Sequence, residues 1–405
     1  MTRKPVRRLQ RPVAIIASSA TPCAHLQSKE SSAVQTVEHE ILGNCVVDAM
    51  ASAGLDKSQI DSLVFTTPRT YTKQRYFGTF MANYLRISCS GVVMEVLGNG
   101  MTGGLAFDQA VLQIASGAAD VALCLGISME TGIDRSAHLA YQMRTNGDVD
   151  FHAPFGLTPR AWYGLDAARY AHESGATREQ LATIAVKSYA NGALNPLATR
   201  RERHTLEQVL AQPPISEGMG LLEFSAPADG AVCLVLATEE IAKASGKPYV
   251  LVRSRGFHHA GMHEISEVPD DMLSFTAAAH AAADAYEAAG ITAQDVDVAE
   301  LYAASTIIEA LVSEAVGLVP RGQGAATAAA GETSLGGRIP INTSGGLISR
   351  GHPAYVTPLY GVVELFDQLR ASAGSRQVKD AGIGIMLSEL GNFSGASVHV
   401  LEAAR

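Results

Sequence analysis

Short apolar runs alternate with segments of helical spacing along this chain, and that alternation limits the folds open to it. The first part of the chain predicts strands at 13–18, 62–66, 92–97 and 121–126, and helices at 34–50 and 101–116. A β-α-β-α order is typical of sheets that helices cover on both faces. The sequence therefore predicts an α/β protein with a largely parallel sheet.

The alternation of strands and helices stops at about 131–222, where helical stretches alternate with loops rich in Pro, Asn and Arg. We expect this segment to be an insertion over the sheet, as a lid or a substrate-binding element. It contains predicted helices at 162–173 and 178–191. The rhythm then resumes, with strands expected at 231–237, 249–256, 297–302, 383–387 and 397–401, a helix at 274–289 and an ordered loop at 322–337. Two halves are therefore expected, residues 1–245 with the insertion and residues 246–405.

Composition narrows the classes of function. The chain has 405 residues, of which 47% are hydrophobic, so a sizeable core is expected. The net charge of −9 comes without a long run of one sign, which gives no reason to expect nucleic acid as a partner. No apolar stretch is long enough to span a membrane, and the basic start lacks the apolar core of a secretory signal. Five scattered cysteines without a C-x-x-C pair fit a cytoplasmic protein.

A glycine-rich turn followed by a histidine marks the first candidate site. The sequence N-T-S-G-G at 342–346 precedes G-H-P at 351–353. Glycines let the backbone approach a ligand closely, and the ordinary pKa of histidine suits general acid or base catalysis near neutral pH. The alternative is that His352 is a structural residue of a Gly-His-Pro turn.

A second glycine-rich turn lies at 98–104, between a predicted strand and a predicted helix. A helix that starts there presents free N–H groups and a positive dipole, so the Gly100 amide could bind an oxygen that gains negative charge. The alternative is a tight turn whose glycines, at 98, 100, 103 and 104, adopt positive φ.

Together these motifs resemble the thiolase superfamily, most closely its sterol-carrier-protein type. Residues 342–353 match the N-x-S-G-G…G-H-P signature, and 99–104 stand where the family has N-C-x-[ST]-G-[SG] with its nucleophilic cysteine. Gly100 stands in the place of that cysteine. The likeness runs over nearly the whole chain, and it includes A-D-G-A at 228–231 and N-x-x-x-N-P at 191–196. It implies a thiolase-like fold with two duplicated β-α-β-α-β halves in a five-layered α-β-α-β-α arrangement, normally a homodimer.

The resemblance also assigns roles at the site. Tyr302 stands where sterol-carrier-type thiolases have the histidine of E-x-H-D-x-F, at the end of a predicted strand; an aromatic side chain with a solvated hydroxyl is the alternative. Many thiolases place a second cysteine in the C-terminal turn, where this chain offers Glu389 and Asn392. We expect His352 and Tyr302 to form a catalytic pair. The expected oxyanion or substrate-binding groups are Gly100, Asn392, Gly346 and Glu389.

Other chemistries receive less support. Cys89 precedes the strand that leads to Gly100, so it would lie roughly 20 Å away at about 3.3 Å per strand residue. The histidines at 258, 259 and 263 lack matching ligand spacing, and the G-x-G-x-x-G at 98–103 lacks an acid at the end of the next strand. We expect no metal and no permanently bound cofactor, with a coenzyme A thioester as substrate.

Three functions remain open. The first is carbon–carbon bond cleavage or formation, of the retro-aldol type on a 3-hydroxyacyl-CoA, which needs no sulfur nucleophile. The second is an acyl-CoA acyltransferase or thiolase with a rearranged site, and the third is a non-catalytic acyl-CoA-binding subunit. Some members of the sterol-carrier-type group are aldolases that work with a small OB-fold subunit, so the resemblance implies that such a partner is possible.

Overall fold

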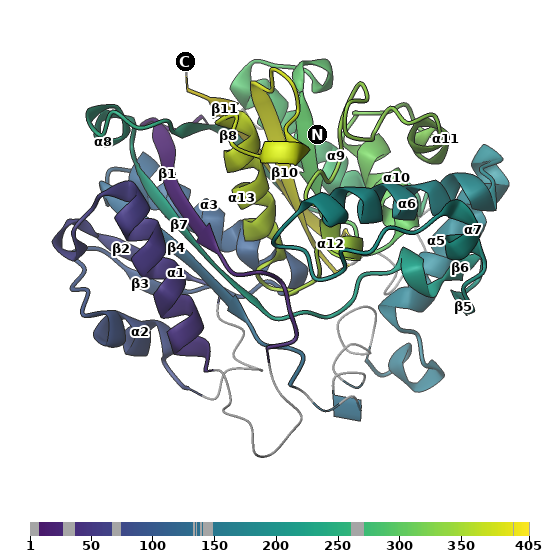
Figure 1. Ribbon diagram of the computed structural model, residues 1–405, viewed down its shortest axis with the longest axis horizontal. Helices are drawn as coiled ribbons and strands as arrows, with labels where there is room; N and C mark the ends of the chain where they lie inside the picture. Colours follow the sequence, from purple (N-terminus) through teal and green to yellow (C-terminus); the bar gives the residue numbers. More distant parts are fainter. Residues whose placement is uncertain are drawn as a thin grey trace.

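A twisted sheet forms the centre of the molecule (Figure 1). The computed structural model describes residues 8–26, 37–66, 74–132, 134, 136, 137, 140, 149–260, 271–391 and 393–404. Within this part of the chain the main sheet has nine strands in the order β3-β2-β4-β7-β1-β8-β11-β10-β9. The strands are β1 Val13–Ala20, β2 Ser62–Phe65, β3 Val93–Glu95, β4 Val121–Ser128, β7 Gly230–Thr238, β8 Val250–His259, β9 Val298–Leu301, β10 Ile383–Leu390 and β11 Gly395–Ala403.

The sheet is mixed, so the expectation of a largely parallel sheet is wrong. Parallel pairing joins β2 to β3, β2 to β4 and β9 to β10. The remaining pairs are antiparallel, because β7 returns between β1 and β4, and β11 returns between β8 and β10. The β10–β11 return needs only a short turn, which an antiparallel pair allows and a parallel pair does not.

Helices and sheet form five layers, as the resemblance to thiolases implied. Helices α1 (Glu38–Ala53) and α2 (Phe77–Leu85) cover the outer face of the β3-β2-β4-β7-β1 portion. Helices α3 (Thr102–Ala115) and α13 (Thr357–Leu369) lie between that portion and the β8-β11-β10-β9 portion, packed on both. Helices α9 (Thr276–Ala289) and α10 (Thr306–Ala315) cover the far face. The two portions join at the β1–β8 pair and enclose the central α3–α13 layer between them.

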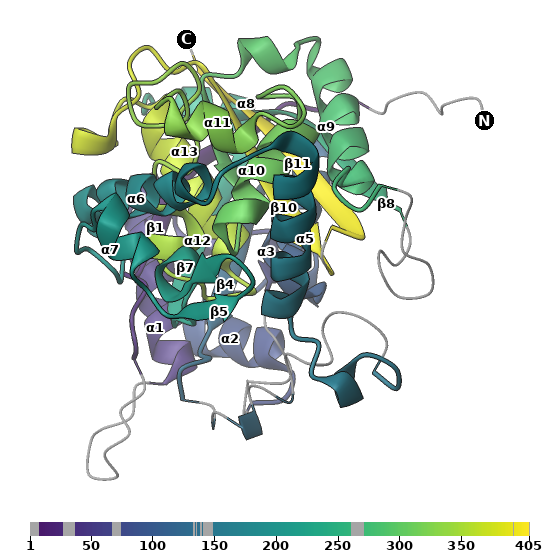
Figure 2. The ribbon, with the colours of Figure 1, turned by 90° about the vertical axis from the view of Figure 1, so that its right-hand side faces the viewer.

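The insertion is mostly helical and packs beside the second portion of the sheet (Figure 2). It contains α5 (Pro159–Ser174), α6 (Arg178–Leu194), α7 (Leu206–Leu210) and a small hairpin of β5 (Pro214–Ser216) and β6 (Met219–Gly220). The two helices predicted in this segment are confirmed as α5 and α6. Helix α6 contacts α10, α11 (Gly324–Ala329) and α12 (Gly346–Ser349), so the insertion reaches the N-T-S-G-G turn.

Local sequence explains some of the helix boundaries. Thr177 and Gln180 form a capping box at the start of α6, and α1 ends at Gly54, whose φ of 75° suits a glycine. Helix α11 falls within the 322–337 segment that was expected to be a loop, because its alanine-rich sequence favours a helix. A remaining short helix, α8 (Glu239–Ala244), connects β7 to β8. Among the described helices, none combines the length and the apolar character needed to cross a bilayer.

Candidate active site

The turn before α3 brings Gly100 to the centre of the site. A 3-10 turn at Asn99–Met101 leads into α3, and the Gly98 N–H donates to Thr102 Oγ1 at 2.9 Å. The left-handed residue of this turn is Asn99, with a φ of 45°, whereas none of the glycines at 98, 100, 103 and 104 has a positive φ. The alternative that these glycines serve positive φ is therefore wrong.

Close approach explains the glycine at position 100. A Cβ atom built there would lie 2.8 Å from Glu389 Oε1, 2.9 Å from Tyr302 Oη and 3.0 Å from the Glu389 carbonyl oxygen. Real Cβ atoms essentially never approach other heavy atoms more closely than 3.0 Å, so a side chain would have to displace these groups. The absence of a side chain lets a hydroxyl and a carboxylate converge on the backbone of residue 100.

Tyr302 and His352 form a direct pair. Tyr302 follows β9, is 6% exposed, and its Oη lies 2.6 Å from His352 Nε2. Burial, and then the negative charge of Glu389, raise the pKa of Tyr302 well above its usual value, so the phenol stays protonated beside the imidazole. The solvated hydroxyl considered from the sequence is thus excluded.

His352 is fixed by its backbone as well as by its ring. Its N–H donates to the Ala226 carbonyl at 3.1 Å, and its carbonyl accepts the Ala228 N–H at 3.3 Å. On the ring, Nδ1 lies 3.3 Å from Ser225 Oγ. The imidazole therefore sits between Tyr302 on one side and the end of the insertion on the other.

Glu389 also belongs to this group, although its Asn- and Gly-containing turn was only a weak sign of function. It lies on β10, is buried, and its Oε2 accepts the Phe393 N–H at 3.2 Å. Gly346 begins α12 in a left-handed conformation. Its N–H, which was expected to bind substrate, instead donates to Ser344 Oγ at 3.2 Å. Asn392 lies outside the residues that the structure describes.

Glu130 is a site residue that the sequence analysis missed. It follows β4, is 6% exposed, and its Oε1 accepts Ser128 Oγ at 3.1 Å and the Ala354 N–H at 3.0 Å. Burial raises the pKa of Glu130 to about 7, and its charge is one of those that raise the pKa of Tyr302. An acid two residues after a mostly apolar strand was the available signal.

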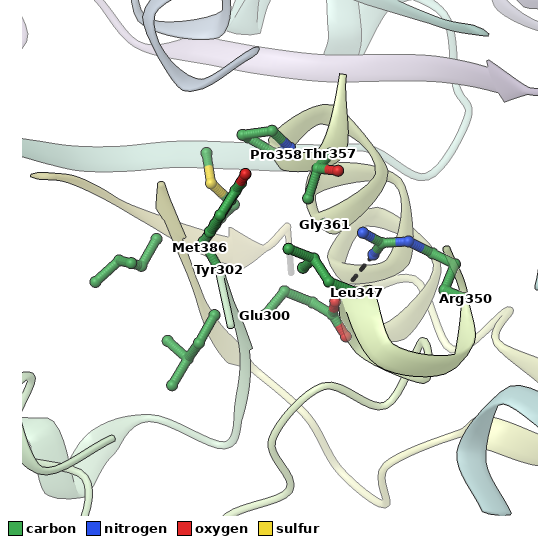
Figure 3. A pocket seen from close by; sticks show the side chains of 10 residues that line it. Glu300, Tyr302, Leu347, Arg350, Thr357, Pro358, Gly361 and Met386 are labelled. Atoms are coloured by element: carbon green, nitrogen blue, oxygen red, sulfur yellow. Dashed lines mark hydrogen bonds and ion pairs between the residues drawn. The ribbon is translucent and has the colours of Figure 1, made fainter. Parts of the chain in front are cut away.

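A buried polar network supports the N-T-S-G-G turn. Glu300 accepts the Ser344 N–H at 3.0 Å and Ser344 Oγ at 2.7 Å, and Arg350 Nη1 lies 3.0 Å from the same Oγ. Figure 3 shows Glu300 and Arg350 at one end of a small cavity of about 10 Å³ and the Tyr302 hydroxyl directed to the other. A cavity of that size holds about one water molecule, so the side chains that support the turn are closely packed.

Metal ligands and reactive thiols do not gather at this site. Among the described residues, no group of three or more His, Cys, Asp and Glu side chains is arranged to hold a metal ion. His258 instead faces His280, with 3.3 Å between ring nitrogens, and His263 is not among the described residues. All five cysteines are free, and burial raises the pKa of Cys23 to about 11, which makes this thiol a poor nucleophile.

Family models match both ends of the chain. The model described as "Thiolase, N-terminal domain" matches residues 13–206, and "Thiolase C-terminal domain-like" matches residues 259–403. An acetyl-CoA acetyltransferase of Methanothermobacter thermautotrophicus is 29% identical, over 87% of this chain and 91% of that protein. Sterol carrier protein 2 of Oryctolagus cuniculus is 31% identical, over 79% of this chain and 60% of that protein.

A solved structure is similar over almost its full length. It is described as an "Ltp2-ChsH2(DUF35) aldolase", with a TM-score of 0.82 and 26% sequence identity. The match covers 98% of this chain and 99% of the other. Human mitochondrial 3-ketoacyl-CoA thiolase in complex with CoA, at 14% identity and a TM-score of 0.75, shares the fold.

Proposed function

Because this chain belongs to the thiolase superfamily, we propose that it is an enzyme that acts on an acyl-CoA thioester without a covalent cysteine intermediate. The reaction we propose is carbon–carbon bond cleavage or formation of the retro-aldol type on a 3-hydroxyacyl-CoA. One observation carries the proposal. The space beside residue 100, where the resemblance puts the nucleophilic cysteine, holds the Tyr302 hydroxyl and the Glu389 carboxylate.

In the cleavage direction, the reaction begins with the β-hydroxyl of the substrate. We assign His352 as the base, acting together with Tyr302, because the two are 2.6 Å apart and a histidine can take up a proton near neutral pH. Loss of the hydroxyl proton forms the carbonyl of the departing product. The Cα–Cβ bond breaks, and its electron pair moves into the thioester as an enolate.

The enolate oxygen then needs hydrogen-bond donors. The Gly100 amide lies at the start of α3, where the helix dipole favours negative charge. The proton taken from the β-hydroxyl returns to the α-carbon through the Tyr302–His352 pair, which gives the shorter acyl-CoA. Protons and electrons therefore balance without a metal, a redox cofactor or a second substrate.

Two findings support this assignment and its partners. The aldolase with a TM-score of 0.82 carries that activity in its name, together with a second protein component. We propose by analogy that a small OB-fold subunit could assist this chain. We also propose a homodimer, because β3 is an edge strand, and Val93 on it and Leu97 just after it are 40% and 58% exposed.

An acyltransferase is the second candidate, because the relative that is 29% identical over 87% of the chain is named for that activity. It would require transfer between two thioesters without a cysteine at residue 100. The two candidates predict different products, so one assay separates them.

The test follows carbonyl product and shortened acyl-CoA from 3-hydroxyacyl-CoA substrates, using the assembly in which the protein is purified. His352→Ala and Tyr302→Phe should each lower the rate by about 10²- to 10⁴-fold, the usual contribution of a general acid or base. Tyr249→Phe is the matched control, since the Tyr249 hydroxyl contacts Glu239 away from the site. Mass spectrometry that trapped an acylated cysteine during turnover would contradict the proposal.

A further inference from the structure

Ser225 lies at the end of the insertion, where the chain passes between α10 and the histidine turn. Its N–H donates to the Ala304 carbonyl at 2.9 Å, and the neighbouring Phe224 forms a bridge with Ser305. On the other side, Pro227 forms a bridge with His352. Backbone contacts thus hold the segment on both sides, and they place Ser225 Oγ 3.3 Å from His352 Nδ1.

Which ring nitrogen of His352 carries the proton follows from the partner of the other ring nitrogen, Nε2. For His352 to act as the base through Tyr302, Nε2 must accept a hydrogen bond from the Tyr302 hydroxyl, which lies 2.6 Å away. A neutral imidazole that accepts at Nε2 carries its proton on Nδ1. The Nδ1–H then has Ser225 Oγ as its acceptor.

We propose that Ser225 is a positioning residue for His352, whose hydroxyl accepts the Nδ1–H and keeps Nε2 directed at Tyr302. The role persists when His352 gains a proton, because both ring nitrogens are then donors and Nδ1–H still needs an acceptor. Ser225 therefore acts as an uncharged counterpart of the carboxylate that orients histidine in hydrolytic triads. The inference rests on the proposed role of His352, but its test does not need turnover.

Other titratable groups surround the pair and must be held constant in the test. The pKa of Tyr302 responds to Glu389 on β10, Glu130 after β4, Tyr163 on α5 and Tyr355 before α13. Ser225 is not titratable, so its replacement changes a hydrogen bond without changing the charge of the site. A changed histidine titration in a Ser225 variant therefore reports on that hydrogen bond.

The experiment is ¹⁵N NMR of histidine-labelled protein, with His352 assigned by its loss in His352→Ala. We expect the Nδ1–H tautomer in the wild type. In Ser225→Ala the pKa of His352 should fall by about 0.5 to 1 unit, because a hydrogen bond to a charged group is stronger than one to a neutral group. The apparent pKa of the low-pH limb in the kcat/KM profile should fall by the same amount. In addition, kcat should fall by about tenfold with little change in KM.

Two variants make the result decisive. Ser225→Thr keeps the hydroxyl and should restore the titration, and Ser245→Ala removes a serine hydroxyl that bonds the Ala242 carbonyl away from the site. A wild-type Nε2–H tautomer, or a His352 titration in Ser225→Ala that matches the wild type, would overturn the inference. Absence of retro-aldol activity together with the expected titrations would reject the proposed reaction and leave the role of Ser225 standing.

Discussion

Gly100→Ala tests whether the space at the centre of the site is filled. The new Cβ would lie 2.8 Å from a buried carboxylate oxygen, 2.9 Å from the Tyr302 hydroxyl and 3.0 Å from a main-chain carbonyl. The carbonyl belongs to β10 and cannot move alone, so we expect overpacking that destabilises the protein by about 1–3 kcal/mol. Gly100 has no positive φ, so backbone strain adds nothing to this value.

Gly382→Ala is the matched control. A Cβ there would meet Asp297 Oδ2 at 3.6 Å, an ordinary contact, and Gly382 likewise has no positive φ. Both substitutions restrict the unfolded chain equally, so that contribution cancels when the two variants are compared. The remaining difference in the free energy of unfolding isolates the crowding at residue 100.

Thermal unfolding measures this difference. For a chain of this length, 1 kcal/mol corresponds to roughly 1 °C, so the midpoint of Gly100→Ala should lie about 1–4 °C below that of Gly382→Ala. Activity should fall by more than about 100-fold, because displacement of Tyr302 by 1 Å is enough for such a loss. Equal midpoints together with full activity would refute the claim that Tyr302 and Glu389 fill this space.

Two further predictions concern buried charges. Because the pKa of Glu130 is raised to about 7 in the folded protein, the fold favours the protonated carboxyl. The stability that this carboxyl contributes is therefore complete at acid pH and is lost as the pH rises through 7. Glu130→Gln keeps both accepted hydrogen bonds, so its stability relative to the wild type should increase by about 2–3 kcal/mol between pH 5 and pH 8 in urea unfolding; no increase would contradict this assignment. Burial alone would raise the pKa of Asp108, but His399 and then Arg255 lower it overall. Asp108→Ala should therefore destabilise the protein by about 3–5 kcal/mol at neutral pH, and thermal scans should show the deficit narrowing as the pH falls through that lowered pKa; a constant deficit would point to packing instead.

The strands of the main sheet and helices α1 and α3 could be predicted because their apolar spacing is a local property, whereas α2 was not predicted. Strand direction could not, since an apolar run reads the same whichever way its neighbour points. Helix α13 was not predicted, although its apolar residues follow a helical period and nearly all of its residues are buried. The alanine-rich α11 was missed because its small residues were taken as a sign of a loop.

The site could be predicted only in part. Motifs identified Gly100, Tyr302, His352 and Glu389, but their meeting depends on packing between distant segments. Positive φ was the structural alternative considered for the glycine, whereas the structure shows a close approach of β10 and Tyr302 to residue 100. Ser225 was missed because its neighbours form no recognisable pattern, and its importance comes from a backbone path fixed by α10 and the histidine turn.

The candidate catalytic centre draws residues from both portions of the sheet, so it depends on both parts of the chain. Gly100 comes from the side of β3, whereas Tyr302 and Glu389 come from β9 and β10 on the other side. A chain severed between α8 and β8 would leave each fragment with only part of the catalytic centre. Turnover would return only when the fragments recombine, so this fold is suited to use as a split reporter of association.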